Sequence, residues 1–370
     1  MSFHSHYKGK KVILTGHTGF KGSWMAEWLL LLGAEVHGYA LDPLPEAVFY
    51  DQLGLSERLA SDTRGDLRDY ETLKNLLQEV DPDFIFHLAA QPLVRLSYEI
   101  PVETFEVNVM GSINLMEAVR ESGISCNVVM ITTDKCYENK EWLHSYREND
   151  SMGGYDPYSA SKGAAEIAIS SYRRSFFSSD ESGVKVVSAR AGNVIGGGDW
   201  AIDRIVPDCI RALDKNEHIP VRNKIATRPW QHVLEPISGY LWLGTVIDNP
   251  ALLRRDSVKE HLGGFNFGPS LSSNRTVEEL VVEILKHCPG NWEDCSDPNA
   301  LHEASKLNLA IDKAFHLLEW RPVWDFSITI EKTVSWYREA EQTGYQNYTQ
   351  LQIKNYTAAA EKQKVSWSKQ

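Results

Sequence analysis

Tyr158 and Lys162 stand four residues apart in the segment YDPYSASKGAAE, where a predicted helix places both side chains on one face. An ammonium group beside a phenol favours the phenolate, so such a pair can take a proton from an alcohol. The same spacing recurs at Tyr7/Lys11 and Tyr70/Lys74, so spacing alone has little weight. Position favours the third pair, because it follows the fifth predicted strand, where an α/β sheet presents its reactive edge.

This chemistry sets an energetic requirement for Tyr158. To accept a proton near pH 7, the phenol must lower its pKa from about 10 by roughly 3, which corresponds to about 4 kcal/mol. One cation about 4 Å away contributes on the order of 4 kcal/mol at an effective dielectric constant near 20. Lys162 and an oxidised nicotinamide ring together can supply this stabilisation of the phenolate. Thr133, at the end of a predicted strand, is the hydroxyl expected to bind the same oxygen, and the three groups suit hydride transfer from a carbinol to NAD⁺.

The segment TTDKCY, residues 132–137, places Asp134 directly beside Lys135 after the apolar run NVVMI. Adjacent opposite charges in a loop are usually a solvated surface pair that contributes little stability. The pair follows Thr133 at the end of a predicted buried strand, and the rest of the chain decides whether it is an exception.

A glycine-rich loop follows the first predicted strand in TGHTGFKG, with Gly16, Gly19 and Gly22 in G-x-x-G-x-x-G spacing. Glycines there allow a tight turn and a close approach to a pyrophosphate, whose charge is met by amides at the start of a helix. The predicted cofactor loop also contains Thr18, Phe20 and Lys21. Asp42, beyond the second strand, is expected to bind the adenosine ribose and repel a 2′-phosphate, which favours NAD over NADP. Lys21 and His17, in the glycine loop, would instead attract a phosphate and favour NADP.

Further cofactor contacts are predicted where the third and fourth strands end. Asp66, in GDLRD with Leu67, is expected to accept from the adenine amino group, although it could instead cap the next helix. Small residues in LAAQ leave room for a ribose and pyrophosphate, although they could also reflect tight packing; they are Ala89, Ala90 and Gln91. Asn108 is assigned to the same site, as an asparagine that braces the backbone beneath it.

Short β-rich runs alternate with helix-length segments through the first two-thirds of the 370 residues. The runs cover 11–16, 35–41, 61–65, 84–90, 127–133 and 184–190, with helices near 22–32, 69–79, 102–121, 158–177 and 203–213. This alternation predicts an α/β fold, a Rossmann-type doubly wound parallel sheet with a smaller α-rich C-terminal lobe. We expect an NAD-binding domain over 1–195 and a substrate-binding lobe over 196–370, interleaved with the first. The polar end of the chain, from about residue 340, is expected to fray.

Composition excludes several classes of protein. The net charge of −12 and the pI near 5.5 argue against nucleic acid or an anionic membrane as a partner. The chain shows no apolar run long enough to span a bilayer and no export signal, and its five cysteines are odd in number and scattered without a CxxC motif. We therefore expect a cytoplasmic protein with free thiols and no metal site.

Together, TGHTGFKG, GDLRD, HLAAQ, TTDK, YSASK and ARAGNVIGGGDWAIDRIVPD resemble the extended short-chain dehydrogenase/reductase superfamily over nearly the whole chain. More narrowly, the chain resembles the nucleotide-sugar 4,6-dehydratases, most closely those that act on CDP-glucose in O-antigen (lipopolysaccharide) deoxysugar synthesis. The resemblance implies oxidation at C4 by NAD⁺, loss of water across C5 and C6, and return of the hydride to C6.

The same resemblance implies roles for the acid–base pair. Asp134 matches the acid for the C6 hydroxyl and would need a pKa raised by burial. Most family members place Glu, the C5 base, at the next position, whereas this chain and the CDP-sugar enzymes have lysine there. Lys135 is either the C5 base with a lowered pKa, or a permanent cation that stabilises the enolate while another group takes the proton.

On the substrate side, the resemblance assigns Asn193 and Arg228 to the diphosphate of CDP-glucose, with Arg222 and Arg204 as further candidates. It also implies a homodimer, or a higher homo-oligomer, formed through the helices near 102–121 and 158–177. Two alternatives remain: a nucleotide-sugar 4-epimerase, which needs no acid–base pair after Thr133, and a non-catalytic dinucleotide sensor, for which Tyr158 and Lys162 are incidental.

Overall fold

Seven parallel strands form the central sheet of the computed structural model, which describes residues 3, 5–45, 48–179, 182–201, 204–253, 263–296 and 306–369. They are β1 (Lys11–Thr15), β2 (Glu35–Ala40), β3 (Ser61–Arg64), β4 (Phe84–His87), β5 (Asn127–Ile131), β6 (Lys185–Ala191) and β11 (Gly264–Phe267). Their order across the sheet is β11-β6-β5-β4-β1-β2-β3. The chain moves outward from β1 in both directions, so the sheet is doubly wound, as predicted, with its switch point between β1 and β4.

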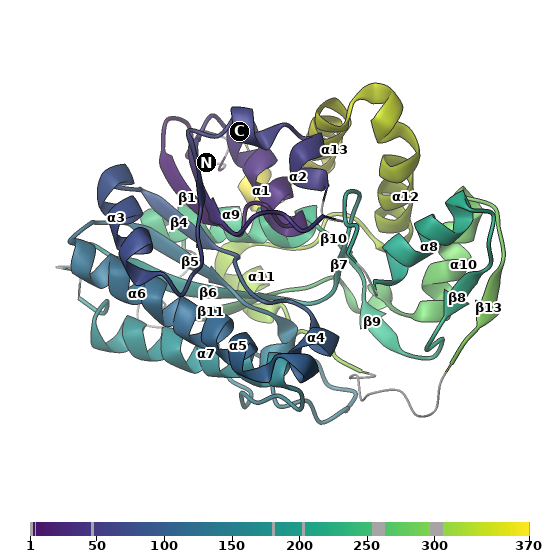
Figure 1. Ribbon diagram of the computed structural model, residues 1–370, viewed down its shortest axis with the longest axis horizontal. Helices are drawn as coiled ribbons and strands as arrows, with labels where there is room; N and C mark the ends of the chain where they lie inside the picture. The colour runs from purple at the N-terminus through teal and green to yellow at the C-terminus, as the bar shows by residue number, and fades with distance from the viewer. Residues whose placement is uncertain are drawn as a thin grey trace.

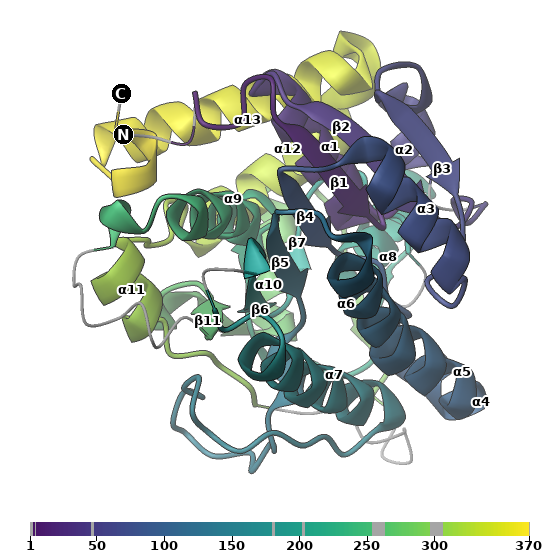
Figure 2. The same cartoon turned by 90° about the vertical axis from the view of Figure 1, so that its left-hand side faces the viewer.

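Helices cover both faces of this sheet (Figure 1, Figure 2). One face carries α1 (Phe20–Leu31) and α9 (Leu234–Asp248); the other carries α3 (Tyr70–Val80), α6 (Gly111–Ser122) and α7 (Pro157–Ser175). Side chains of β1 alternate between the two cores: Val12 and Leu14 join the cluster that contains Trp24, while Ile13 joins the cluster that contains Leu73. Burial on both faces explains why the predicted strands read as continuous apolar runs.

The helix predicted over 102–121 is interrupted. Residues Pro101–Phe105 form α5, Glu106–Met110 form a π-helical turn, and α6 continues from Gly111. Within that turn Asn108 is 1% exposed, and its side chain bonds the backbone of Gln91 as well as Ser161 on α7. Wider turns of this kind often occur at functional sites, where they redirect one side chain.

A smaller lobe lies beside the carboxyl edge of the sheet and has its own apolar core (Figure 1). It contains α8 (Ile205–Asp214), α10 (Val277–His287) and two strand pairs, β8 (Ile219–Val221) with β13 (Trp292–Asp294) and β9 (Thr227–Pro229) with β12 (Asn274–Thr276). The remaining short elements are α2 (Phe49–Gln52), α4 (Val94–Glu99), α11 (Asp312–Leu318), β7 (Val194–Ile195) and β10 (Gln231–His232). The smaller α-rich lobe therefore has the predicted character.

Segments beyond residue 195 also return to the sheet. Strand β11 pairs with β6, and α9 packs against β5 and β6. The α9 segment, LEPISGYLWLGTVID, is buried almost throughout and apolar on most sides, so its sequence lacks the one-sided pattern of a surface helix. The division near residue 195 remains a prediction, and the two parts are interleaved along the chain.

The C-terminal segment is helical and packed, so the prediction that it frays is wrong. Helices α12 (Phe326–Thr343) and α13 (Tyr345–Lys362) form a hairpin beside α1 (Figure 1). Tyr356 and Trp367 are both 0% exposed, and their rings lie 5.8 and 6.1 Å from that of Trp28. Tyr348, Ile353, Tyr356 and Ala360 of α13 join the main core, and its polar residues Thr349 and Gln352 are also buried.

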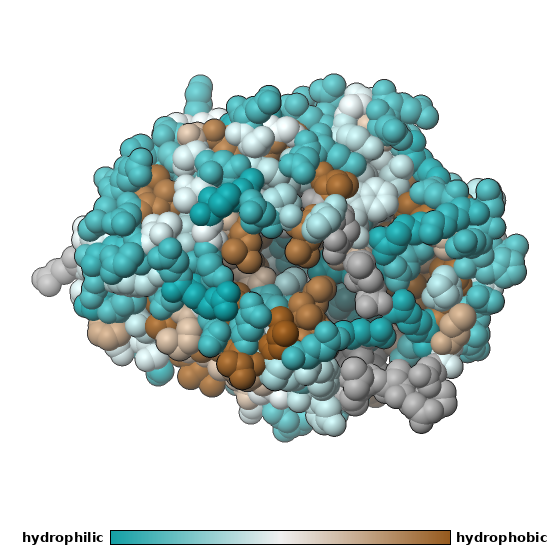
Figure 3. Space-filling model, in the orientation of Figure 1, coloured by the Kyte–Doolittle hydropathy of each residue, from teal (hydrophilic) through white to brown (hydrophobic). Residues whose placement is uncertain are grey.

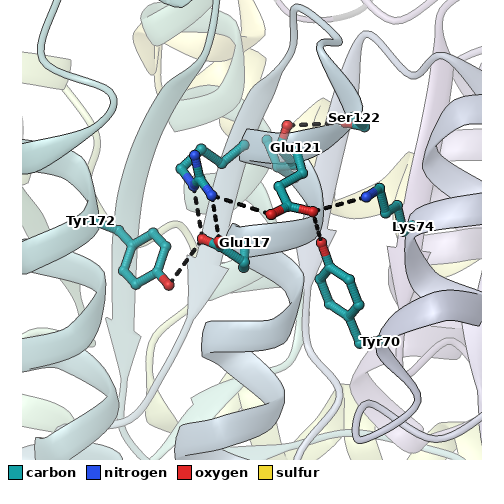
Figure 4. A network of polar contacts seen from close by, with 8 residues as sticks. Tyr70, Lys74, Glu117, Glu121, Ser122 and Tyr172 are labelled. Carbon is teal, nitrogen blue, oxygen red and sulfur yellow. Dashed lines mark hydrogen bonds and ion pairs between the residues drawn. The ribbon is translucent and has the colours of Figure 1, made fainter.

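A network of charged and phenolic side chains joins α3, α6 and α7 on the outside of the sheet (Figure 4). Glu121 accepts from Tyr70 and Lys74 on α3 at 2.6 and 2.8 Å, and Glu117 accepts from Tyr172 on α7 at 3.2 Å. Arg120 bonds both glutamates. These contacts hold the catalytic helix α7 against its neighbours, although exposed pairs of this kind contribute at most about 1 kcal/mol each.

No helix within the described residues is both long and apolar enough to cross a membrane. All five cysteines are described, and all are free thiols.

Candidate active site

One cavity of about 770 Å³ lies between the carboxyl edge of the sheet and the smaller lobe, where the molecular surface is hollowed (Figure 3). Most residues predicted as functional line it: Gly16, Thr18, Gly19, Phe20, Lys21, Gly22, Asp66, Leu67, Ala89, Ala90, Thr133, Asp134, Lys135, Tyr158, Lys162, Asn193, Arg204, Arg222 and Arg228. The structure thus brings the glycine loop, the Thr-Asp-Lys segment, the Tyr-Lys pair and the predicted substrate residues to one site.

The glycine loop turns tightly into α1. Gly16 has φ +74°, and a Cβ there would lie 2.7 Å from the backbone nitrogen of Ala89. A Cβ at Gly22 would overlap the carbonyl oxygen of Gly16. By contrast, a Cβ at Gly19 would meet only that oxygen, at 3.5 Å, so protein packing does not require glycine there. Gly19 caps α1 and lines the cavity, which leaves open space for a ligand at the helix start.

The start of α1 also suits an anion. Gly19 provides no side-chain cap, and the first turn contains no acidic residue. The amides of that turn therefore face the cavity with the positive end of the helix dipole. Phosphate oxygens of a dinucleotide fit this donor set.

Asp134 lies in a 3₁₀ turn, Asp134–Cys136, directly after β5, and is 1% exposed. Its Oδ1 accepts a 3.0 Å hydrogen bond from Thr133 Oγ1, whereas Oδ2 is buried without a hydrogen-bond partner among the described residues. A Cβ at Gly192 would lie 2.9 Å from that oxygen, so glycine keeps the space beside it clear. Burial raises the pKa of Asp134, against the opposing effects of Lys135, Thr133, Arg228 and Lys21. An acid for a sugar hydroxyl requires a shift in this direction.

Tyr158 lies in the first turn of α7, which Asp156 caps by accepting from the backbone nitrogen of Ser159 at 2.9 Å. Tyr158 is 8% exposed and lines the cavity together with Thr133. Burial raises the pKa of Tyr158, the Asp134 carboxylate raises it further, and Thr133 and Arg204 oppose the rise. The lowered pKa that catalysis requires is therefore not a property of the chain alone, and positive charge brought by a cofactor is needed.

Two buried amines line the cavity with this phenol. Burial lowers the pKa of Lys162 to about 8, although Glu166 and Cys136 raise it. Burial likewise lowers the pKa of Lys21 to about 8, assisted by Arg204 and Lys162 and opposed by Asp134. Lys21 Nζ donates to Tyr240 Oη on α9 at 3.4 Å. Lys135, which is half-buried beside them, donates its backbone N–H to Thr133 Oγ1 at 3.4 Å.

Positive and amide side chains from the smaller lobe complete the cavity. Arg228, on β9, is 7% exposed, and its charge lowers the pKa of Asp134. Arg204 precedes α8 and bonds the buried carboxylate of Asp199 at 2.8 Å. Arg222 is 47% exposed and lies 3.9 Å from Asp208, while Asn193 lies between β6 and β7. Such a group suits the diphosphate of a nucleotide ligand.

Asp42 lies outside the cavity lining, next to the lining residue Leu41, and its predicted contact with the adenosine ribose remains a prediction. Its side chain is 86% exposed and pairs with Arg64 at 3.3 Å. Strand β2 ends at Ala40, and Leu41 is the last residue of this segment that lines the cavity.

Asn108 and Gln91 also lie behind the cavity wall and not in its lining. The Asn108 amide accepts from Gln91 N at 2.9 Å and donates to Gln91 O at 3.1 Å, and the Gln91 side chain bonds Thr104. Both residues brace the backbone that follows β4, which is the bracing role predicted for Asn108. Asp66 does line the cavity, but Arg68 binds its carboxylate at 2.7 Å, and Asp69 caps α3.

Several lining residues were not predicted. Arg95, Tyr98 and Glu99 belong to α4, a short helix after β4 with no pattern of its own in the sequence. Tyr240, which accepts from Lys21 and lies behind the lining, belongs to the apolar α9 segment, where nothing in the sequence separates it from ordinary core residues. Asp199, which bonds Arg204, follows the Gly-rich segment IGGG, and an aspartate in that context is typical of a turn.

The chemistry available at the site is proton transfer beside a dinucleotide. No group of three or more His, Cys, Asp or Glu in the described ranges could hold a metal ion. The open helix start, the clear space at Gly19 and the small residues at 89–90 fit the pyrophosphate and ribose of NAD.

Comparison with known proteins places these features in a family. Residues 13–333 match the family model described as GDP-mannose 4,6 dehydratase. The chain is 45% identical over 340 residues to CDP-glucose 4,6-dehydratase of Salmonella typhimurium, which covers 90% of this chain and 91% of that protein. That relative spans the glycine loop, the catalytic segment and the smaller lobe alike.

Solved structures share the fold. UDP-glucose 4-epimerase of Thermotoga maritima, solved with UDP-glucose, superposes with a TM-score of 0.75 at 19% identity, over 90% of this chain and 99% of that one. A dTDP-glucose 4,6-dehydratase of Streptomyces venezuelae, solved with NAD, gives a TM-score of 0.74 at 23% identity, over 90% and 98%. Epimerases and dehydratases therefore share this architecture, and the fold does not separate them.

Proposed function

This chain belongs to the GDP-mannose 4,6-dehydratase family, and we propose that it is an NAD-dependent dehydratase that converts CDP-D-glucose into CDP-4-dehydro-6-deoxy-D-glucose. The observation that supports this most strongly is the shared cavity. Thr133, Asp134, Lys135, Tyr158 and Lys162 line it together with the glycine loop, so oxidation and elimination can occur at one bound sugar.

Bound NAD would accept the hydride from C4 of the sugar and return it to C6. Tyr158, which lines the cavity together with Thr133, takes the proton of the 4-hydroxyl. Lys162, with a pKa of about 8, is mostly protonated at pH 7 and supports the phenolate. Because Tyr158 has a raised pKa in the chain alone, the proton transfer belongs to the complex and not to the free protein.

Elimination of water uses the other half of the site. The new 4-ketone acidifies the C5 proton, and the C6 hydroxyl leaves as water after it receives the proton of Asp134. The buried, partnerless Oδ2 of Asp134 suits an acid that is neutral before reaction. We assign the C5 proton to Lys135, with Lys21 as the second amine of the cavity, because both line the same wall as Asp134.

The substrate diphosphate is assigned to Arg228, Arg222 and Asn193. Arg228 is buried beside Asp134, so its bound phosphate would hold the sugar over the acid. A guanidinium can bind two phosphate oxygens at once, which fixes direction as well as charge. The preference for cytosine is supported by the 45% identical relative, and a role in O-antigen synthesis in the cytoplasm remains a prediction.

The alternative 4-epimerase would use Tyr158, Lys162 and Thr133 but has no use for a buried acid at Asp134. The alternative sensor would have no use for any of them. Incubation with CDP-glucose and NAD⁺ separates the three. We expect a 4-keto sugar with base-induced absorbance. Its mass should be about 18 Da lower than that of the substrate, which is the mass of one water. CDP-galactose would indicate the epimerase, and unchanged substrate would indicate the sensor. UDP-glucose, which differs from CDP-glucose only in the nucleobase, is the matched control for nucleobase preference.

We also propose that the chain forms at least a homodimer through α5, α6 and α7. Four large apolar side chains are exposed on these segments: Val102 at 71%, Phe105 at 38%, Met110 at 50% and Ile167 at 62%. Burial of such a surface against a second copy would remove it from water. Light scattering should give a mass of at least twice 41.8 kDa, and Val102→Asp with Ile167→Asp should reduce it to that of one chain.

A further inference from the structure

Glu166 joins three elements that position the catalytic groups. It lies on α7, one turn after Lys162, and is 4% exposed. Its Oε1 accepts from Thr132 Oγ1 at the end of β5, immediately before Thr133. Its Oε2 accepts from Ser188 Oγ at 2.8 Å and from Arg190 Nη2 at 2.7 Å, both on β6.

Arg190 keeps Glu166 ionised. Burial raises the pKa of Glu166, but Arg190 and the hydrogen bonds from Thr132 and Ser188 outweigh it and leave the pKa below its usual value. Arg190 is itself 5% exposed and donates to Tyr137 Oη at 2.7 Å. A carboxylate with three donors, one of them a buried arginine, is therefore a fixed negative charge in this core.

That charge acts on Lys162. Burial lowers the pKa of Lys162, and Glu166 is the first of the groups that raise it again. The second is Cys136 in the 3₁₀ turn, a thiol whose own pKa burial raises well above its usual value, so it is neutral at pH 7. Lys21 on α1 and His87 on β4 also interact with Lys162, and burial lowers the pKa of each of them. Among these groups Glu166 is the one carboxylate.

Other charges act on Glu166 from the opposite side. Arg173, also on α7, and Lys313, on α11, both interact with its carboxylate. The cations Arg190, Arg173 and Lys313 lie on the side away from the cavity. Glu166 thus separates a group of positive charges from the catalytic ammonium.

We propose that Glu166 is a positioning residue that keeps Lys162 protonated and holds the end of β5, and with it Thr133, against the catalytic helix. This inference rests on the proposed function for its catalytic meaning, but the charge effect on Lys162 does not. Without the Glu166 carboxylate, Lys162 would lose its proton at a lower pH, and the phenol of Tyr158 would lose the cation that supports it.

Two variants separate the two parts of the role. Glu166→Gln keeps the length of the side chain and removes the charge, so the Lys162 titration should move to a pH lower by at least 1. Glu166→Asp keeps the charge but shortens the reach to Thr132, so the titration should stay within about 0.3 of wild type while kcat falls. Ser188→Ala, which removes one neutral donor to the same oxygen, is the matched control and should leave the titration unchanged.

The titration is measured by competitive acetylation of Lys162 with acetic anhydride across pH 6–10, read by peptide mass spectrometry. This readout needs neither substrate nor turnover, so a wild-type protein without dehydratase activity would end the proposed function and leave the charge effect measurable. A Glu166→Gln midpoint equal to that of wild type would overturn the inference. If Glu166→Gln does not fold, the neutral pair Glu166→Gln/Arg190→Gln takes its place, with a lower midpoint expected and an unchanged one again contradictory.

Discussion

Thr133 Oγ1 donates a 3.0 Å hydrogen bond to Oδ1 of Asp134, and the same hydroxyl lowers the pKa of the Tyr158 phenol. A hydroxyl has one proton, so an ionised Asp134 directs it away from any sugar oxygen. A neutral Asp134 can donate its own proton and frees Thr133 to turn toward the substrate. Burial, which raises the pKa of Asp134, therefore prepares both the acid and the threonine.

Replacement of Tyr158 by phenylalanine should abolish turnover and leave ligand binding intact. The phenol takes the first proton, and loss of a positioned acid–base group typically costs 10²- to 10⁴-fold in rate. Stopped-flow NADH formation with CDP-glucose should fall by about 10³-fold, with Kd for the sugar nucleotide within about threefold of wild type. Tyr155→Phe, at an exposed phenol three residues away, is the control. Wild-type turnover in the Tyr158 variant would remove the catalytic assignment.

Asp134→Asn should separate oxidation from elimination. The amide keeps the size of the side chain but cannot donate a carboxylic proton to the C6 hydroxyl. We expect NADH to form in a single turnover and to persist, because the hydride has no dehydrated acceptor, while product formation falls by about 10²-fold or more. The wild-type elimination rate should decline at high pH, where the raised pKa of Asp134 is exceeded. Equal losses in both steps would indicate that Asp134 acts only through Thr133.

Lys135→Glu should weaken dehydration more than oxidation at C4. The change replaces the residue adjacent to Asp134 with a second carboxylate, which raises the pKa of Asp134 further and replaces the amine expected at C5. Quenched-flow analysis of NADH and 4-keto product should show the second step slowed selectively. If NADH formation slows in step with product, Lys135 acts before elimination, and Lys21 becomes the amine to test at C5. Solvent deuterium incorporation at C5 gives a direct reading of the proton transfer.

Much of the sheet was predictable because its strands are buried on both faces. The runs that became β1, β4 and β5 are short and mostly apolar, and the glycine loop is a local backbone requirement at Gly16 and Gly22. Strand β11 escaped prediction because GFNF is only four residues long and joins β6 from far along the chain. The apolar helix α9 has no periodicity to detect.

Within the site, residue type and position at strand ends predicted Thr133, Asp134 and Tyr158 in one cavity. The ribose contact of Asp42 remains a prediction: β2 ends at Ala40, and the exposed carboxylate pairs with Arg64. Glu166 was not identified, because a glutamate inside a helix usually faces water, and only the tertiary fold shows Arg190 beside it. The spacing of residues along the sequence does not reveal charges that interact only because the fold buries them as a pair.

Trp367→Ala should destabilise the whole fold, because the C-terminal segment is part of the main core. The indole is 0% exposed and stacks on Phe3 at 5.0 Å and on Tyr356 at 5.7 Å. Truncating a large buried aromatic side chain typically costs about 3–5 kcal/mol. Urea unfolding monitored by circular dichroism should show this loss at an unchanged m-value. Trp142→Ala, at a tryptophan that is 37% exposed, should cost much less; equal losses would mean that the segment does not pack as described.

Glu235 should make stability depend on pH in the direction opposite to that of a salt-bridged carboxylate. It is 0% exposed on α9, where it accepts from Val323 N, Trp324 N and Tyr356 Oη. Burial nevertheless raises its pKa from 4.5 to about 7. The folded protein therefore binds this proton more tightly than the unfolded chain does. The contribution to stability is complete below pH 4.5 and is lost as the pH rises to about 7.

The test compares unfolding free energies of wild type and Glu235→Gln between pH 4.5 and 8. The glutamine keeps an acceptor for the two backbone amides, and its amide can donate to Tyr356, whose hydroxyl can turn to Ser238 at 3.2 Å. A pKa difference of about 2.5 corresponds to about 3 kcal/mol, so the glutamine variant should gain up to that amount relative to wild type across this range. Glu331→Gln, at an exposed glutamate on α12, should parallel wild type. If Glu235→Gln also parallels it, the carboxylate is ionised throughout, and its three donors outweigh burial.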